Sequence, residues 1–264
     1  MTDEAPLVSL SRSGGVATVT MQRPPANALT PEFIAEVAAA VETAGADPAT
    51  RVIVLRSALE RIFVAGADIA NMASRISGAP EVAQVGVLGE HLLTIERVEK
   101  PTIAAISGHA LGGGCELALV CDYRLMVDDG RASIGQTETA LGLLPGAGGT
   151  QRLPRLVGWG RALHLIMEGR RLRAPEALAI GLVDAIHPPE EFAAAVTDKA
   201  EQLAAMATRA LGLVKRVLRE ASEDGLQAGL AAERRAFTEV LRSADIREGV
   251  GAFLEKRPPS FTGR

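Results

Sequence analysis

Cysteine is scarce in this chain of 264 residues, and basic residues hold no surplus. Cys115 and Cys121 are too few for a disulfide framework, and no histidine pair stands near them to complete a structural zinc site. Lys and Arg number 28 against 32 Asp and Glu, which gives a net charge of −4. Because proteins that bind nucleic acids or anionic membranes usually carry a basic surplus, we expect neither partner.

Signals for export or membrane insertion are also lacking. Residues 1–6 do not contain the basic residues and the following apolar stretch that a signal peptide needs. The least charged long segment, residues 101–120, contains a proline, a histidine, four glycines and a glutamate, which make it a poor membrane span. We therefore expect a cytoplasmic protein.

Several common catalytic motifs are absent as well. The chain has no Gly-x-Ser-x-Gly elbow of serine hydrolases, no GxxxxGK[ST] phosphate loop and no HExxH zinc motif. It also lacks the GxGxxG loop of dinucleotide-binding folds. The four histidines stand far apart in the sequence, so we expect ordinary structural histidines rather than a metal site.

The composition that remains is that of a globular protein, with 47% apolar and 23% charged residues. Short β-like runs alternate with helical runs up to about residue 188, after which only helical runs follow. The expected strands are 7–12, 16–22, 51–57, 102–107 and 123–127, and the expected helices are 30–44, 80–99, 114–121, 149–168, 190–206, 208–222, 226–243 and 245–255. The pattern predicts an α/β core over residues 1–190 and a helical part over residues 191–264.

Three successive glycines, residues 112–114, follow the expected strand 102–107 and open an apolar helix. Free N–H groups at a helix N-terminus can bind an anion or a polarised carbonyl oxygen, and glycines allow a ligand to approach the backbone closely. The alternative is a tight turn that packing alone requires, and this segment by itself does not decide between the two.

Two carboxylates lie in apolar surroundings. Glu116 stands in the first turn of the helix after the glycines, among Cys, Leu, Ala and Val, and Glu138 is flanked by small and apolar residues. A desolvated carboxylate has a raised pKa, which suits proton transfer. The simpler interpretation of Glu116 is a carboxylate that stabilises the helix dipole. If the fold brings the two together, they form an acid and base pair.

A further small-residue loop, residues 65–67, follows a β-like run and again permits close approach of a ligand to the backbone. Asp68 comes directly after it, and we interpret this side chain as the N-cap of a helix over residues 69–76 rather than as a catalytic group.

Together these segments resemble the crotonase superfamily, which is also called the enoyl-CoA hydratase/isomerase family. The matching pieces cover nearly the whole chain, and their combination is far more specific than any one of them. They are RPPANALT at 23–30, FVAGADI at 63–69, the run at 103–122, IGQTETALGLLPGAGGTQRLPRLVG at 134–158, AxxxGLVD at 177–184 and EGVGAFLEKRPPSF at 248–261.

The resemblance implies an α/β fold: a crotonase-like spiral of ββα units with a helical C-terminal part. Residues 1–190 would form the spiral core with the acyl-CoA site, and residues 191–264 would form a helical trimerisation region. The family's members are homotrimers, often stacked as a dimer of trimers. They bind acyl-CoA thioesters and need no cofactor, because coenzyme A is part of the substrate, and the resemblance implies no metal.

The resemblance also implies roles for particular residues. Glu116 would activate water for attack at Cβ, Glu138 would exchange the proton at Cα, and the backbone N–H groups of Ala67 and Gly113 would form an oxyanion hole. The remaining positions that match the family's substrate contacts are Pro25, Ala26, Ala28, Ala65, Asp68, Ile69, Gly146 and Phe261.

The tail at residues 256–261 is expected to expose Phe261 beside Lys256 and Arg257, near the CoA phosphates of a neighbouring subunit. Two departures from the family pattern concern acyl specificity. Thr137 precedes Glu138 where hydratases usually have proline, and residues 128–131 lengthen a turn between the two glutamates.

Three functions are consistent with the resemblance. Retention of both glutamates favours a monofunctional 2-enoyl-CoA hydratase in fatty-acid or related acyl-CoA catabolism. A Δ3-Δ2-enoyl-CoA isomerase on the same scaffold needs only one base and is the alternative. A non-catalytic member that binds acyl-CoA or RNA fits poorly with the net charge of −4 and two intact carboxylates.

Overall fold

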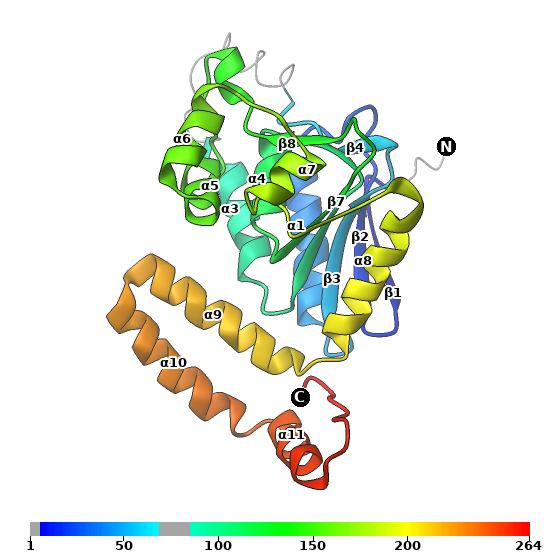
Figure 1. Ribbon diagram of the computed structural model, residues 1–264, viewed down its shortest axis with the longest axis vertical. Helices are drawn as coiled ribbons and strands as arrows, with labels where there is room; N and C mark the ends of the chain where they lie inside the picture. The colour runs from blue at the N-terminus through cyan, green and yellow to red at the C-terminus, as the bar shows by residue number, and fades with distance from the viewer. Residues whose placement is uncertain (1–5, 69–84) are drawn as a thin grey trace.

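The strands of the protein form two sheets (Figure 1), in a computed structural model that describes residues 6–68 and 85–264. The large sheet has the order β1 (Val8–Ser13), β2 (Val16–Met21), β3 (Val52–Ser57), β5 (Thr102–Ile106), β7 (Tyr123–Val127) and β10 (Ala185–His187). The small sheet has the order β4 (Arg61–Val64), β6 (Gly108–Leu111), β8 (Ser133–Gly135) and β9 (Leu172–Arg173).

From β3 to β8, successive strands alternate between the two sheets, which makes this part of the chain a spiral. β3, β5 and β7 pair in parallel in the large sheet, and the strands that follow them, β4, β6 and β8, pair in parallel in the small sheet. Helices come between these strand pairs: α3 (Val85–Arg97) precedes β5, and α4 (Gly113–Leu119) follows β6. This repeated ββα order confirms the predicted crotonase-like spiral.

The core explains why the strands were recognisable as apolar runs. Every residue of β5 is buried, as are the first four residues of β3, because both strands are central in the large sheet. Helix α1 (Pro31–Ala46) covers this sheet and buries an apolar face that includes Phe33, Ile34 and Val37. It begins as predicted, since the Thr30 hydroxyl accepts a hydrogen bond of 3.2 Å from the Phe33 N–H.

The prediction of one helix over residues 149–168 is wrong. Two helices, α5 (Gly149–Val157) and α6 (Trp159–Met167), meet at Gly158, whose φ of +85° ends the first and turns the chain into the second. No strand was expected between the end of β5 and the glycines at 112–114, but the chain forms strand β6 there. Gly108 of β6 permits this close pairing, since a Cβ there would lie 1.9 Å from the Arg61 carbonyl carbon.

Strands β8, β9 and β10 and the short helix α7 (Ala174–Ala179) are further elements that the sequence pattern did not predict. The three strands have three residues or fewer and the helix has six, so each is shorter than the window over which hydrophobic periodicity can be recognised.

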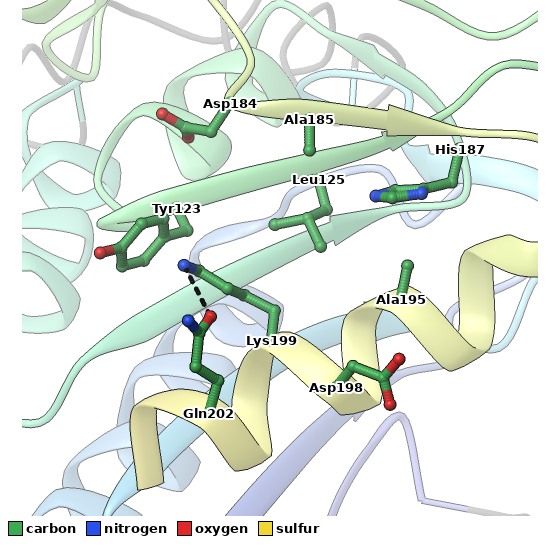
Figure 2. A pocket seen from close by; sticks show the side chains of 9 residues that line it. All are labelled: Tyr123, Leu125, Asp184, Ala185, His187, Ala195, Asp198, Lys199 and Gln202. Carbon is green, nitrogen blue, oxygen red and sulfur yellow. Dashed lines mark hydrogen bonds between the residues drawn. The ribbon is translucent and has the colours of Figure 1, made fainter. Parts of the chain in front are cut away.

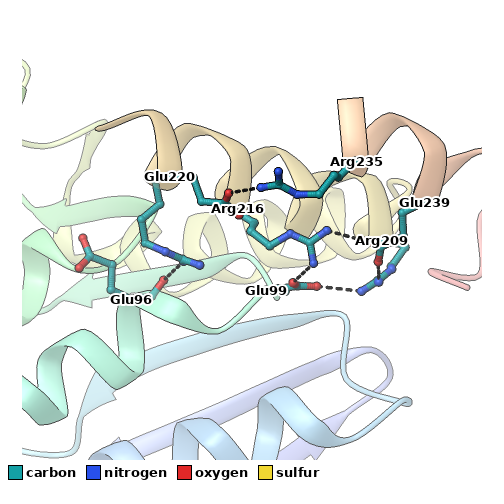
Figure 3. A network of polar contacts seen from close by, with 8 residues as sticks. Glu96, Glu99, Arg209, Arg216, Glu220, Arg235 and Glu239 are labelled. Atoms are coloured by element: carbon teal, nitrogen blue, oxygen red, sulfur yellow. Dashed lines mark hydrogen bonds and ion pairs between the residues drawn. The ribbon is translucent and has the colours of Figure 1, made fainter. Parts of the chain in front are cut away.

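The four helices predicted at the C-terminal end are present as α8 (Pro189–Ala204), α9 (Thr208–Asp224), α10 (Leu226–Val240) and α11 (Ala244–Glu255). Helix α8 packs on the large sheet, whereas α9 and α10 form a hairpin that extends beyond the two sheets (Figure 1). Glu99 next to α3 binds Arg209 and Arg216 of α9, and Glu239 of α10 binds the same two arginines (Figure 3). Within the described residues, none of the helices has the length and hydrophobicity needed to cross a membrane.

Candidate active site

Glu116 lies in the first turn of α4, which runs into the middle of the molecule. Only 2% of this residue is exposed. The helix can start here because of its glycines: Gly112 adopts a φ of +53°, and a Cβ on Gly114 would lie 2.1 Å from the Val64 carbonyl oxygen of β4. The glycine run therefore sets α4 directly against the small sheet and carries Glu116 into the interior.

Two backbone N–H groups hold the Glu116 carboxylate. Ala147 and Gly149 each donate a hydrogen bond of 2.8 Å to Oε1. Burial raises the pKa of Glu116 above its ordinary value, and the two N–H groups and the charge of Arg152 oppose this increase. The carboxylate is therefore fixed in position and has an environment suited to proton transfer.

Glu138 begins the 3-10 helix η2 (Glu138–Leu141) and is half-buried beside the start of α4. A Cβ added to Gly112 would lie 3.0 Å from Glu138 Oε1, which places the carboxylate over the glycine run. Burial raises the pKa of Glu138 to about 7, and the negative charge of Glu116 contributes to this increase. The fold thus brings the two predicted carboxylates into one site.

Gln136 is a site residue that the sequence reasoning missed. It is buried, and its amide nitrogen donates hydrogen bonds of 3.1 and 3.2 Å to the two Glu138 oxygens when the amide is oriented to satisfy its neighbours. A Cβ on Gly149 would lie 2.9 Å from Gln136 Cδ, so the side chain also contacts the turn that holds Glu116. Its position two residues before Glu138, in a segment already assigned to the site, was the available signal.

The backbone N–H groups of Ala67 and Gly113 lie close to each other. A Cβ on Gly113 would lie 3.7 Å from the Ala67 nitrogen. Ala67 and Leu29 form an isolated β-bridge. Its two hydrogen bonds use the residues on either side of Ala67: the Leu29 N–H donates to Gly66 O, and the Asp68 N–H donates to Leu29 O. The N–H of Ala67 itself takes no part in the bridge. Within residues 6–68 and 85–264, neither N–H has a hydrogen-bond partner, as an oxyanion hole requires.

Most of the predicted substrate contacts fall in two loops, residues 24–29 and residues 65–69, and the described part of the second loop, 65–68, pairs with the first. The Ala65 N–H donates to Ala26 O at 3.1 Å. Pro25 and Ala65 are exposed at the surface, and Ala26 and Ala28 are half-buried. The predicted contacts Ala26 and Ala65 therefore lie side by side, in the same pair of loops as Ala67.

The buried side chain of Asn27 anchors the first loop to the interior through hydrogen bonds. It is completely buried with a φ of +49°, and its amide donates to Ser57 Oγ at 2.8 Å and to Phe63 O at 2.9 Å. Asp68 is half-buried and forms an ion pair of 2.9 Å with Arg23, which also donates to Ala28 O. The predicted helix over residues 69–76, and with it Ile69, lies outside the described residues.

Gly146 and Phe261 lie in different parts of the molecule. Gly146 is exposed and directly precedes Ala147, whose N–H binds Glu116. The expectation that Phe261 is exposed is wrong: it is half-buried, because its ring packs on α11, where a Cβ on Gly249 would lie 3.3 Å from it. Its predicted contact with a neighbouring subunit's CoA stays a prediction.

Of the two basic side chains expected beside Phe261, that of Arg257 is engaged within its own chain. Its guanidinium forms two hydrogen bonds, of 2.6 and 2.9 Å, with the Glu248 carboxylate. These bonds lower the pKa of Glu248 to about 2. Arg257 thus ties the tail to α11.

A cavity of about 580 Å³ lies elsewhere, between helix α8 and strands β7 and β10 (Figure 2). None of the predicted site residues lines it. Lys199 is placed over the Tyr123 ring at 4.4 Å and binds Gln202, so its charge is satisfied within the cavity wall. This cavity is therefore separate from the site of the two glutamates.

The chain is similar to known proteins over nearly its whole length. The family model described as enoyl-CoA hydratase/isomerase matches residues 11–264. Crotonyl-CoA hydratase of Syntrophomonas wolfei is 39% identical over 97% of this chain and 98% of its own. Short-chain-enoyl-CoA hydratase of Clostridium acetobutylicum is 39% identical over 95% of both. A crystal structure of enoyl-CoA hydratase from Bacillus anthracis superimposes with a TM-score of 0.89 at 37% identity, covering 98% of this chain and 100% of that one.

Proposed function

The chain belongs to the enoyl-CoA hydratase/isomerase family, and on this premise we propose that it adds water reversibly to a 2-enoyl-CoA to give a 3-hydroxyacyl-CoA. The observation that carries the proposal is the meeting of Glu116 and Glu138 beside two free backbone N–H groups. Hydration of a conjugated thioester needs a base for water, an acid for Cα and a donor for the thioester oxygen, and this site offers all three.

The first requirement is to stabilise the negative charge that develops on the thioester oxygen. When water attacks Cβ, the electron pair of the double bond moves toward the thioester carbonyl, whose oxygen gains enolate charge. The N–H groups of Ala67 and Gly113 are fixed before the substrate arrives, since one belongs to a paired loop and the other to the start of α4. Preorganised donors of this kind stabilise developing charge without reorganisation.

The two carboxylates then divide the proton transfers. We assign ionised Glu116 to take a proton from water while the water oxygen bonds to Cβ, through Oε2, because Oε1 is occupied by two N–H donors. Protonated Glu138 delivers its proton to Cα as the enolate collapses. The two glutamates together carry one proton before and after the reaction. The proton starts on Glu138 and a proton ends on Glu116, so proton exchange with solvent must restore the starting state.

The exposed loop surface formed by Pro25, Ala26, Ala28 and Ala65, with Asp68 at its end, is proposed to hold the adenine and pantetheine of coenzyme A. No cofactor is proposed beyond the CoA of the substrate. Gly146 would line the water and acyl site because it adjoins Ala147. Related hydratases act on crotonyl and other short-chain enoyl groups, which makes crotonyl-CoA the first substrate to test.

Assembly and location are further proposals. We propose a cytoplasmic homotrimer or dimer of trimers in fatty-acid or related acyl-CoA catabolism. Its support is the set of large apolar side chains left exposed on α10 and α11, which include Phe237 at 64% and Phe253 at 82% exposed. In such an assembly the tail with Phe261 would reach the CoA site of a neighbour.

The test is a direct assay of the purified protein on crotonyl-CoA, followed by the loss of absorbance of the conjugated thioester. Rapid loss with formation of 3-hydroxybutyryl-CoA supports the hydratase. A parallel assay on 3-hexenoyl-CoA distinguishes isomerase activity from hydratase activity. A protein that hydrates nothing but converts the 3-enoyl to the 2-enoyl thioester would replace the proposal by isomerisation, and inactivity in both assays would refute it.

A further inference from the structure

Arg152 of α5 lies behind the turn that holds Glu116. Its Nη1 donates a hydrogen bond of 3.0 Å to Ala147 O, on the residue whose N–H binds Glu116 Oε1. The side chain passes directly over Gly148, where a Cβ would lie 1.9 Å from Nη1 and where φ is +105°. The guanidinium and the turn are therefore fitted to each other.

Glu96 of α3 fixes the guanidinium from its other side. Arg152 Nε donates to Oε1 at 3.0 Å and Nη2 donates to Oε2 at 2.6 Å, a bidentate pair with little exposure on either side chain. Arg219 of α9 donates to the Glu96 carbonyl oxygen at 3.5 Å, near the ionic network of Figure 3. The Arg152 guanidinium is thus held between Glu96 of α3 and the turn whose N–H groups bind Glu116.

We propose that Arg152 is a positioning residue for Glu116: it fixes the turn whose N–H groups hold Oε1, and it places a guanidinium behind this carboxylate. The inference rests on the proposed function, since Glu116 needs a fixed position and an ionised form only if it activates water. A lysine would keep the charge but not the fork that reaches both Glu96 and Ala147.

The charges around Glu116 make the proposal measurable. Among the described residues, Arg152 from α5 and Glu138 from η2 are the charged groups that act on this site, and the Cys115 thiol beside Glu116 stays protonated because burial raises its pKa. Arg152 lowers the pKa of Glu116, and Glu96 partly neutralises Arg152. Removing Arg152 and removing the charge of Glu96 should therefore shift the pKa of Glu116 in opposite directions.

The experiment follows the Glu116 carboxyl by NMR titration of protein labelled with ¹³C at the glutamate carboxyl, with E116Q used for assignment. We expect R152M and the double variant E96Q/R152M to raise the pKa of Glu116, E96Q to lower it, and R152K to leave it nearer to the wild-type value. R155M is the matched control, an exposed arginine on the same helix, and it should cause no shift.

Kinetics on crotonyl-CoA give the second measurement. Because Arg152 acts through Glu116 and not on CoA, R152M and R152K should lower kcat by about 10²-fold, the scale of a catalytic group displaced by about 1 Å, with little change in KM. If R152M does not fold, R152K and E96Q still carry the test. An unchanged Glu116 pKa in R152M or E96Q/R152M, shifts of the same sign in R152M and E96Q, or a KM effect alone would overturn the inference. A wild type that does not hydrate would refute the proposed function, while the titration would still decide whether Arg152 controls Glu116.

Discussion

Burial raises the pKa of Glu138 to about 7, and the negative charge of Glu116 adds to this increase, although the two glutamates come from different elements of the fold. Glu116 is brought there by the start of α4, and Glu138 by the 3-10 helix after β8. Two carboxylates that repel each other in this way favour the state in which one proton is held between them. That singly protonated state is the one that hydration and its reverse both need.

The pH dependence of catalysis follows from this sharing. As pH rises through the pKa of Glu138, the pair loses its last proton, so kcat/KM should fall above about pH 7. Hydration of crotonyl-CoA and dehydration of 3-hydroxybutyryl-CoA should fall together, since both start from the same number of protons. Initial rates between pH 5 and 9, roughly the range over which a pKa near neutrality is resolved, provide the measurement. A profile that stays flat to the alkaline end would contradict the shared proton.

The oxyanion hole can be tested at Gly113, which is the first residue of α4. Proline fits this position of a helix but has no N–H, so G113P should lose about 10²–10³ in kcat, or roughly 2.7–4 kcal/mol of transition-state stabilisation. G113A retains the N–H and adds only a methyl group 3.1 Å from Leu29 Cδ1, so it is the control. Near-full turnover by a folded G113P would show that Gly113 is misassigned.

Asn27 should matter for stability. Its amide satisfies Ser57 Oγ and Phe63 O in the interior, so N27A leaves buried polar groups without partners. We expect the free energy of unfolding to fall by about 1–3 kcal/mol, measured by urea denaturation. S57A, which removes one of these two partners, should cost less. Equal stability of N27A and wild type would show that the hydrogen bonds of Asn27 do not stabilise the loops.

The apolar surface of α11 predicts assembly. Phe253 is 82% exposed in the single chain, and F253D should weaken the trimer by placing a charge in an apolar contact. Light scattering after size exclusion at micromolar concentration compares F253D with wild type, and E233Q on the exposed face of α10 serves as control. A wild-type monomer under these conditions would contradict the proposed trimer.

The long elements were predictable because their patterns are local. The buried runs of β3, β5 and β7 and the capped start of α1 at Thr30 carry their own signals. β6 has no local sequence signal of this kind. Its Gly108 has low strand propensity, and glycine is needed there because a side chain would clash with Arg61. The pairing of β6 with β4 and β8 therefore depends on contacts between segments that are distant in the sequence.

The sequence indicated the two buried glutamates of the candidate site, but neither Gln136 nor the contacts that hold the carboxylates. Apolar neighbours indicated that Glu116 is desolvated, and only 2% of it is exposed. The hydrogen bonds from Ala147 and Gly149, the amide of Gln136 and the guanidinium of Arg152 come from segments separated in the sequence. Their convergence depends on the packing of α4 against α5 and the turn before it, which no local pattern encodes.

The central claim is that Glu116 and Glu138 act as one acid and base unit in hydration. The most direct measurement is the rate of crotonyl-CoA hydration by E116Q, E138Q and the double variant, since glutamine keeps the volume and removes the proton-transfer group. We predict that each single change lowers kcat by at least about 10²-fold, and that the double variant loses much less than the product of the two. Full hydration activity in E116Q, with activity abolished in E138Q, would contradict the two-carboxylate mechanism and favour a single base.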